Sequence, residues 1–399
     1  MMKKAIQLLT AGALAGVILT GISAAAAVDY SELQSDYGVR ILEKMSAETF
    51  TDSSGTALNY RIYKSPAYNA EDKSKPAALF VYLHGSGGSE SDNIKQITDQ
   101  PAIVNYLVSD SADTFFKDLP YIVIAPQCPK TDQWVDLEYD TGSYSIDSIP
   151  ITPSLKAVYE LIQNILETEN VAKNNVMLTG ISMGGYGTWD LALRYPEAFN
   201  TIVPICGGGD PTKAAALKDM RIWAFHCDGD KSVPVAGSRD MINALKEAGI
   251  DAKYTEFEIA SHNAWKPALE DVKDPYMIEW MIDGISYTVS IEAEGEGTVS
   301  ESKTLKRGES MTVDIVPAEG YQLSSLYIDG ELAEAPEGKY VFENVTASHT
   351  VKAVFEEIPK EKGLTTPQII AIIIGIFAAL TASGVAVAVA LVASKKKKQ

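Results

Sequence analysis

Short, continuously apolar segments alternate with amphipathic segments over most of the chain up to residue 285. The segments AALFVYLHG (77–85) and YIVIAPQ (121–127) predict two buried strands. VMLTG, TIVPICG, RIWAFHC and KYTEFEIA predict four more, each preceded by a helix-like segment. Residues 153–169 predict a helix whose apolar face comprises Leu155, Val158, Leu161, Ile162 and Ile165. Because apolar strands separated by helices form parallel sheets covered on both faces, we expect an α/β fold with a mostly parallel sheet.

Two regions depart from this alternation. Residues 47–65 (AETFTDSSGTALNYRIYKS) predict an early hairpin with a turn near residues 53–55. From residue 287 to 357 the chain has short segments of period-two alternation separated by glycine turns, with no helical stretch. This pattern is typical of a separate, small β module.

Both ends of the chain carry targeting patterns. MMKK precedes an apolar stretch and SAAAAVDY, which is the order of a secretory signal peptide. Near the other end, an uncharged apolar stretch long enough to cross a bilayer is followed directly by four lysines, which mark the cytoplasmic side. The predicted organisation is a signal peptide (1–27), an α/β domain facing outwards (28–285), a β module (286–357), a linker (358–366), a transmembrane helix (367–394) and a basic cytoplasmic tail (395–399).

Composition narrows the choice of partners. The formal net charge is −19, and no basic stripe is present to neutralise phosphates, so nucleic acid is not an expected partner. The three cysteines, Cys128, Cys206 and Cys227, match no zinc spacing, and we expect no metal. Buried free thiols are the simplest expectation, although a bridge between Cys206 and Cys227 stays open because both would end consecutive strands.

Ser182 lies in GISMG, after an apolar run and before a helix-like segment over residues 182–195. G-x-S-x-G in this setting predicts a sharp strand-to-helix turn that presents the serine oxygen as a nucleophile. Gly180 and Gly184 are expected because the turn leaves no room for Cβ atoms.

An activated serine needs a general base and an acid that orients it, in the chain order serine, acid, histidine. Of the four histidines, only His262 follows the serine and the acid candidates within the α/β domain, so we expect it to be the base. The acid should lie after RIWAFHC, at the carboxyl end of that strand. Asp230 is the preferred candidate and Asp228 the alternative.

Backbone amides should stabilise the oxyanion. One is expected from Met183, directly after the serine, and a second from the HGSGG segment, where Ser86 is the first choice and Gly87 the second. Trp134 and Trp265 are candidates for lining the substrate pocket, with core packing as the alternative.

Five ordered segments carry a resemblance to the α/β-hydrolase superfamily: YLHGSGGSESDN, IAPQCPKTDQW, GISMGGYGTWDLALRYPEAFNTIVPICGGGD, WAFHCDGDKSVPV and SHNAW. They resemble most closely secreted carboxylesterases related to dienelactone hydrolases, polyhydroxybutyrate depolymerases and feruloyl esterases. The resemblance implies a serine esterase without a cofactor, with Ser182, Asp230 and His262 as its triad. Cys227 departs from the glycine that relatives often carry there. The β module resembles repeat domains of bacterial surface proteins, which are usually spacers or adhesive units.

The expected function is therefore hydrolysis of carboxylic esters by a membrane-anchored extracellular enzyme, on small esters or on acetylated or feruloylated polysaccharides. Two alternatives stay open. A peptidase of the same fold is disfavoured because no propeller-like domain precedes residues 28–285. A surface adhesion protein that uses the fold as a scaffold is disfavoured because the full set of site residues is present.

Overall fold

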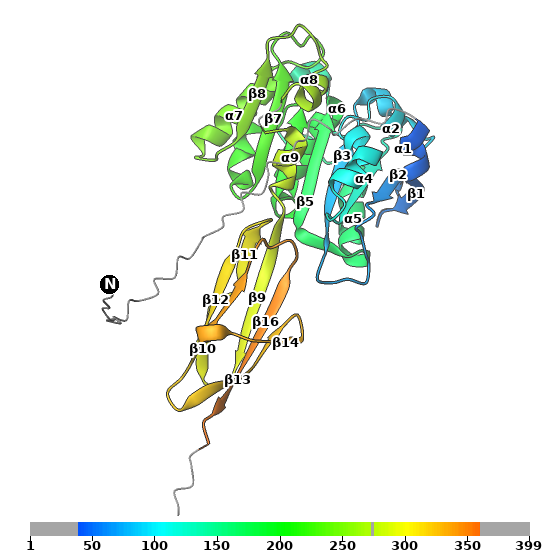
Figure 1. The fold of residues 1–399 in the computed structure, drawn as a ribbon. Helices are drawn as coiled ribbons and strands as arrows, with labels where there is room; N and C mark the ends of the chain where they lie inside the picture. Colours follow the sequence, from blue (N-terminus) through cyan, green and yellow to red (C-terminus); the bar gives the residue numbers. More distant parts are fainter. Residues whose placement is uncertain (1–38, 273–274, 360–399) are drawn as a thin grey trace, which may run out of the picture. The chain divides into compact units, whose positions relative to one another are not determined.

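The computed structural model describes residues 39–272 and 275–359, which divide into two compact units (Figure 1). The described residues of the first unit are 39–272, 275–287, 304–309 and 344–348, and those of the second are the rest. No helix within these described ranges is long and apolar enough to cross a membrane. The predicted signal peptide, transmembrane helix and basic tail lie outside the described residues.

The first unit is built on an eight-stranded sheet with the order β1-β2-β4-β3-β5-β6-β7-β8 (Figure 1). The β1–β2 and β2–β4 pairs are antiparallel, and all the others are parallel, which confirms the predicted mostly parallel sheet. The strands are β1 (Ser46–Thr51), β2 (Ala57–Lys64), β3 (Ala77–Leu83), β4 (Tyr121–Pro126), β5 (Val171–Ile181), β6 (Thr201–Ile205), β7 (Arg221–Cys227) and β8 (Lys253–Phe257).

Helices cover both faces of this sheet (Figure 1). Its α-helices are α1 (Val39–Lys44), α2 (Lys95–Thr98), α3 (Val104–Leu107), α4 (Asp110–Phe115), α5 (Pro153–Thr168), α6 (Met183–Arg194), α7 (Ala236–Glu247), α8 (Trp265–Glu270) and α9 (Met277–Ile282). Short 3-10 helices are η2 (Ser86–Gly88), η3 (Tyr139–Thr141), η4 (Pro196–Ala198) and η5 (Pro211–Leu217). The segment before β7 is thus a 3-10 helix instead of an α-helix.

The core explains why the central strands are apolar throughout. Every residue of β3 and of β4 is buried, because helices pack against both faces of the sheet. Leu79, Val81 and Leu83 point to the face that α5 covers, where they join one hydrophobic cluster with Leu161 and Ile165. The predicted apolar face of α5 is therefore its buried face, and Pro153 stands in its first turn after the capping Thr152.

The β module contains two sheets. Three strands pair in the order β10 (Gly297–Val299), β12 (Met311–Pro317) and β15 (Lys339–Phe342). Five pair in the order β11 (Lys303–Lys306), β9 (Ser286–Glu294), β16 (His349–Glu357), β13 (Tyr321–Ile328) and β14 (Glu331–Ala333). Only a 3-10 turn, η6 (Pro336–Gly338), interrupts the strands in the described part of the module, as the alternating pattern predicts.

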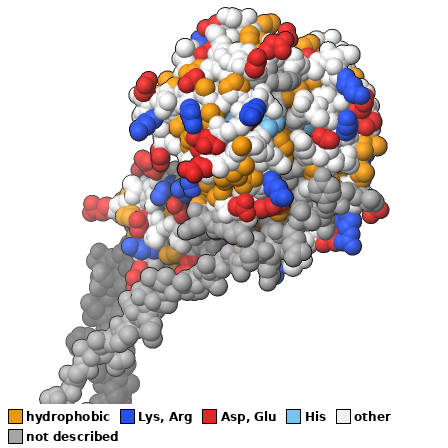
Figure 2. Space-filling view, turned by 90° about the horizontal axis from the view of Figure 1, so that it is seen from above, with side chains coloured by type: hydrophobic (Ala, Val, Ile, Leu, Met, Phe, Trp, Pro, Cys, Tyr) orange, Lys and Arg blue, Asp and Glu red, His pale blue; other side chains and the backbone are white. Residues whose placement is uncertain are grey.

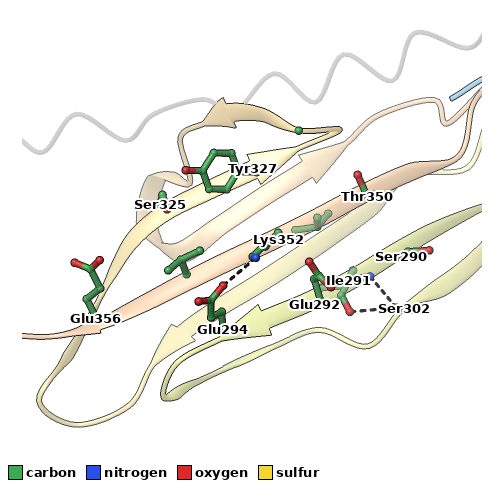
Figure 3. Close-up of a pocket in the computed structure, with 13 residues that line it drawn as sticks. Ser290, Ile291, Glu292, Glu294, Ser302, Ser325, Tyr327, Thr350, Lys352 and Glu356 are labelled. Atoms are coloured by element: carbon green, nitrogen blue, oxygen red, sulfur yellow. Dashed lines mark hydrogen bonds and ion pairs between the residues drawn. The ribbon is translucent and has the colours of Figure 1, made fainter. Parts of the chain in front are cut away.

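One face of the five-stranded sheet is polar and borders a cavity of about 850 Å³ (Figure 3). Lys352 on β16 and Glu294 on β9 form an ion pair of 2.9 Å across it, and Tyr327 on β13 lies nearby. Alternate residues of β16, such as Val351 and Phe355, are buried instead. The period-two pattern of the sequence thus separates a solvent face from a core face.

Surface charges on the first unit are interspersed. On the described part of the face that Figure 2 views, acidic side chains alternate with Lys and Arg, and histidine atoms reach the surface among uncharged side chains (Figure 2). This face therefore has a mixed surface without a large patch of one charge.

Candidate active site

Ser182 stands at the turn between β5 and α6, as the N-terminal capping residue of α6. Its backbone has φ 55° and ψ −117°, which is a strained conformation for a residue other than glycine. The strain is held by two backbone hydrogen bonds: the Ser182 amide donates to Ile205 O (2.9 Å), and the Ser182 carbonyl accepts from the Tyr186 amide (3.1 Å). The neighbouring strand and the helix thus fix the turn that carries the hydroxyl.

Steric contact explains the two glycines around Ser182. A Cβ atom at Gly180 would lie 2.3 Å from Gly184 O, and one at Gly184 would lie 2.0 Å from Leu83 O. Both positions therefore require glycine, because backbone atoms occupy the space that a side chain needs.

The hydroxyl, an imidazole and a carboxylate form one hydrogen-bonded chain. His262 Nε2 lies 2.8 Å from Ser182 Oγ, and His262 Nδ1 lies 2.6 Å from Asp230 Oδ2. Ser182 is 8% exposed, and the His262 side chain is 25% exposed, so the reacting atoms can be reached from solvent. Asp228 follows the same strand but is exposed, and it is the Asp230 carboxylate that contacts His262.

Asp230 remains ionised because its environment is rich in donors. Burial alone would raise the pKa of this carboxyl, but hydrogen bonds from His226, His262 and the amides of Val233 and Ser232 outweigh it and hold the pKa well below its usual range. The two amides donate to Oδ1 at 3.0 and 2.8 Å, which leaves Oδ2 for the imidazoles. A fixed anion beside Nδ1 keeps the proton on that nitrogen and leaves Nε2 free to accept one from Ser182.

His226 is a residue of this site that sequence reasoning did not assign. Its Nε2 lies 3.4 Å from Asp230 Oδ2, and its Nδ1 lies 2.8 Å from Ser238 Oγ. It is completely buried. The only sequence signal was its position at the end of β7, where it precedes the acid by four residues.

His84 follows β3 and fixes the start of the loop that carries Ser86 and Gly87. Its Nε2 accepts from the Cys128 amide (2.9 Å) and its Nδ1 lies 2.6 Å from Gly85 O, so the neutral form with the proton on Nδ1 satisfies both partners. Burial lowers the pKa of His84 to about 4, although the bond to Gly85 O acts in the opposite direction. The His84 carbonyl accepts from Trp134 Nε1 (3.0 Å). Hydrogen bonds therefore hold both the imidazole and the backbone carbonyl of His84.

The predicted oxyanion donors border a common groove. Ser86 begins η2 and Met183 begins α6, and both line a groove of about 690 Å³ together with Gly87. Amides in the first turn of a helix have no partner within the helix and so can bind an anion. The rest of the groove is largely polar, with Lys95, Lys130, Asp132, Gln133 and Asp136 among its lining residues.

The two candidate tryptophans have different surroundings. Trp134 is 0% exposed and belongs to the hydrophobic core. It is therefore a core-packing residue, and the alternative prediction that it lines the substrate pocket was wrong. Trp265 is 9% exposed, lies edge-on to His262 with 5.5 Å between ring centroids, and lines a second cavity beside the site. Cys128, Cys206 and Cys227 are buried, free thiols.

Three side chains near Ser182 offer metal-ligating atoms. Those of Cys206, His226 and Asp230 lie within 4.8 Å of one another. Burial raises the pKa of the Cys206 thiol well above its usual value, so it stays protonated, whereas a metal binds the thiolate. Asp230 Oδ2 is also engaged by His262. These three side chains are therefore better suited to supporting the His262 imidazole than to binding a metal ion.

Two sequence families match the chain. The family described as Phospholipase/Carboxylesterase matches residues 68–278, more than half of the chain. A family described as Divergent InlB B-repeat domain matches residues 287–359. No curated protein matches.

Solved structures also resemble the chain. A thermostable esterase is 33% identical with a TM-score of 0.53, and the match covers 60% of this chain and 63% of that one. A ferulic acid esterase is 14% identical (TM-score 0.41; 57% and 95% covered), and an acylaminoacyl peptidase from Pyrococcus horikoshii is 16% identical (TM-score 0.40; 56% and 38% covered). The chain thus spans less than two thirds of the thermostable esterase.

Proposed function

The chain belongs to the phospholipase/carboxylesterase family, and from this premise we propose that it is a serine esterase that hydrolyses carboxylic esters through an acyl-enzyme. The observation that carries the proposal is the continuous chain of hydrogen bonds from Ser182 Oγ through His262 to Asp230. Such a chain is the arrangement that converts a weakly nucleophilic hydroxyl into an effective nucleophile.

In the proposed reaction, Ser182 Oγ attacks the ester carbonyl while its proton passes to His262 Nε2. The ionised Asp230 stabilises the imidazolium that results, and the amides of Met183 and Ser86 stabilise the oxyanion. His262 then protonates the departing alcohol oxygen, which leaves Ser182 acylated. In the second half, His262 takes a proton from water, the hydroxide attacks the acyl carbonyl, and Ser182 recovers its proton as the acid leaves.

The groove beside Ser86 and Met183 supports substrates larger than simple short esters. Its volume of about 690 Å³ lies within the usual range of ligand sites, and its polar lining suits a hydroxylated or charged group better than a lipid chain. We therefore propose that polysaccharide-linked acetyl or feruloyl esters are accepted. The sequence patterns at both ends support placing the enzyme outside the cell, tethered by residues 367–394, with the β module as a spacer.

The test is hydrolysis of nitrophenyl acetate by the full chain and by Ser182→Ala. We expect Ser182→Ala to reduce kcat by at least about 10³-fold, because no other group replaces the nucleophile. Ser148→Ala, which changes an exposed serine, should retain full activity. Equal turnover by Ser182→Ala would refute the mechanism, and cleavage of aminoacyl nitroanilides in preference to nitrophenyl esters would favour a peptidase.

A further inference from the structure

The proposed reaction assigns no role to the buried histidine beside Asp230. His226 near the end of β7 and Ser238 in the first turn of α7 are both 0% exposed. His226 Nδ1 lies 2.8 Å from Ser238 Oγ, and Ser238 Oγ lies 3.0 Å from Gly207 O. His226 Nε2 lies 3.2 Å from Val233 O and 3.4 Å from Asp230 Oδ2. One ring nitrogen is therefore anchored by α7, and the other faces the turn that carries the acid.

The partners of the ring determine where its proton lies. Val233 O is a carbonyl oxygen and Asp230 Oδ2 belongs to an ionised carboxylate, so neither atom can donate a hydrogen bond. Without a proton, Nε2 would face two acceptors in a buried site, which is unfavourable. Nε2 therefore carries a proton that points to both oxygens. This holds whether Ser238 Oγ gives its hydrogen to Nδ1 or to Gly207 O, because the second case only adds a proton at Nδ1.

This N–H group supports the turn that presents Asp230 to His262. The amides of Ser232 and Val233 bind one carboxylate oxygen, Oδ1, at 2.8 and 3.0 Å. His226 contacts the other oxygen, and it also contacts the carbonyl of Val233, whose amide is one of those two donors. The imidazole thus acts on the carboxylate directly and through the turn.

Burial makes a long contact effective here. The 3.4 Å between Nε2 and Oδ2 is long for a hydrogen bond, but the side chains of His226 and Asp230 are both 0% exposed, so water does not screen the attraction. His262 Nδ1 lies 2.6 Å from the same Oδ2 atom. A rotation of the carboxylate would therefore weaken the bond that orients the general base.

Resting on the proposed esterase function, we propose that His226 is a positioning residue: its Nε2–H holds the Asp230 carboxylate in the orientation that His262 needs. Ser238 anchors the opposite ring nitrogen. His226 takes no proton during the reaction, and it is not among the described residues that line the groove beside the expected oxyanion donors. Loss of His226 should therefore act on kcat and leave KM nearly unchanged.

A double-mutant cycle on kcat for nitrophenyl acetate tests this role, with Ser182→Ala as the blank. His226→Leu removes both ring nitrogens and should lower kcat about tenfold, with KM within about twofold of the wild type. In the Asp230→Ala background the same change should lower kcat less than about twofold, because the carboxylate that His226 positions is already gone. General damage to the site would instead lower kcat equally in both backgrounds.

Two milder variants test the same chain of contacts. His226→Gln keeps a side-chain N–H donor and should restore kcat to within about threefold of the wild type. Ser238→Ala leaves the imidazole in place but removes its anchor, and should lower kcat about threefold, again only where Asp230 is present. The Ser238 variant tests the proposal even if His226→Leu fails to fold.

Ser65→Ala is the matched control for Ser238→Ala. Ser65 is 3% exposed, and its Oγ donates to Leu119 O (3.1 Å) and accepts from the Tyr121 amide (2.9 Å). Tyr121 is the first residue of β4, whereas Ser182 follows the last residue of β5, so the two serines lie at opposite ends of the parallel strands. This variant also loses a buried hydroxyl, but it should retain full kcat.

The outcomes separate the two proposals. If Ser182→Ala hydrolyses nitrophenyl acetate as fast as the wild type, the esterase proposal fails. If hydrolysis depends on Ser182 but His226→Leu leaves kcat unchanged, acts only through KM, or acts equally with and without Asp230, only the positioning proposal fails. A kcat for His226→Gln no higher than that for His226→Leu would also overturn it, as would equal effects of Ser238→Ala in the two backgrounds.

Discussion

His84 should make the first unit sensitive to mild acid. The imidazole is 1% exposed, and its two nitrogens are matched to a neutral ring, with Nε2 accepting from Cys128 and Nδ1 facing Gly85 O. Protonation would place a second N–H against the Cys128 amide. The folded protein therefore resists protonation, and the pKa of His84 falls to about 4.

The size of the stability loss follows from the difference between the pKa of His84 in the unfolded chain and its pKa in the folded chain. The unfolded chain binds the proton with a pKa of 6.5, so it gains protons that the folded chain refuses as the pH falls below that value. Stability contributed by the neutral ring is present above about pH 6.5 and is lost between there and about pH 4. From about pH 7 to about pH 5, the loss from this single residue is about 2 kcal/mol. Because the ring is fully buried, solvent screening does not reduce it.

Urea unfolding monitored by tryptophan fluorescence measures this quantity. All five tryptophans lie in the first unit, so the signal reports on that unit alone. His84→Gln retains an acceptor for the Cys128 amide and removes the titration, so its stability should fall by about 2 kcal/mol less than that of the wild type over this pH interval. His349→Gln, in the β module, should behave like the wild type. An equal loss in the wild type and in His84→Gln would refute the reasoning.

Three further predictions concern particular contacts. Asp230→Asn should reduce kcat/KM for nitrophenyl acetate by roughly 10³- to 10⁴-fold, because the amide favours the wrong imidazole tautomer, whereas Asp228→Asn should stay within about threefold; a larger loss at Asp228 would reverse the assignment. Gly184→Ala places a Cβ atom 2.0 Å from Leu83 O and should destabilise the first unit by more than about 2 kcal/mol, measured by urea unfolding. Gly297→Ala places one 2.5 Å from the Phe355 ring, and should lower the melting temperature of the β module in calorimetry while esterase activity is retained.

The sequence predicted the parts of the fold that depend on local pattern. Strands β3 and β4 are buried on both faces, so their apolar runs were unambiguous, and α5 buries the face that its periodicity indicated. The turn at Ser182 was predictable for a steric reason, since only glycine fits at positions 180 and 184. Trp134 was ambiguous because an indole serves equally well in a core and in a pocket.

The rest of the site depends on how distant segments pack, which no local pattern encodes. Asp228 and Asp230 follow the same strand, and only the turn in which the amides of residues 232 and 233 bind Asp230 decides which carboxylate faces His262. The loop that precedes α3 has no helical or strand period in its sequence, and Ala102 within it has φ 42°, a conformation that an alanine adopts only when its surroundings impose it. This irregular segment shares one cavity with Asn263 and Trp265, so its conformation depends on packing between distant parts of the chain, which a local sequence period cannot encode.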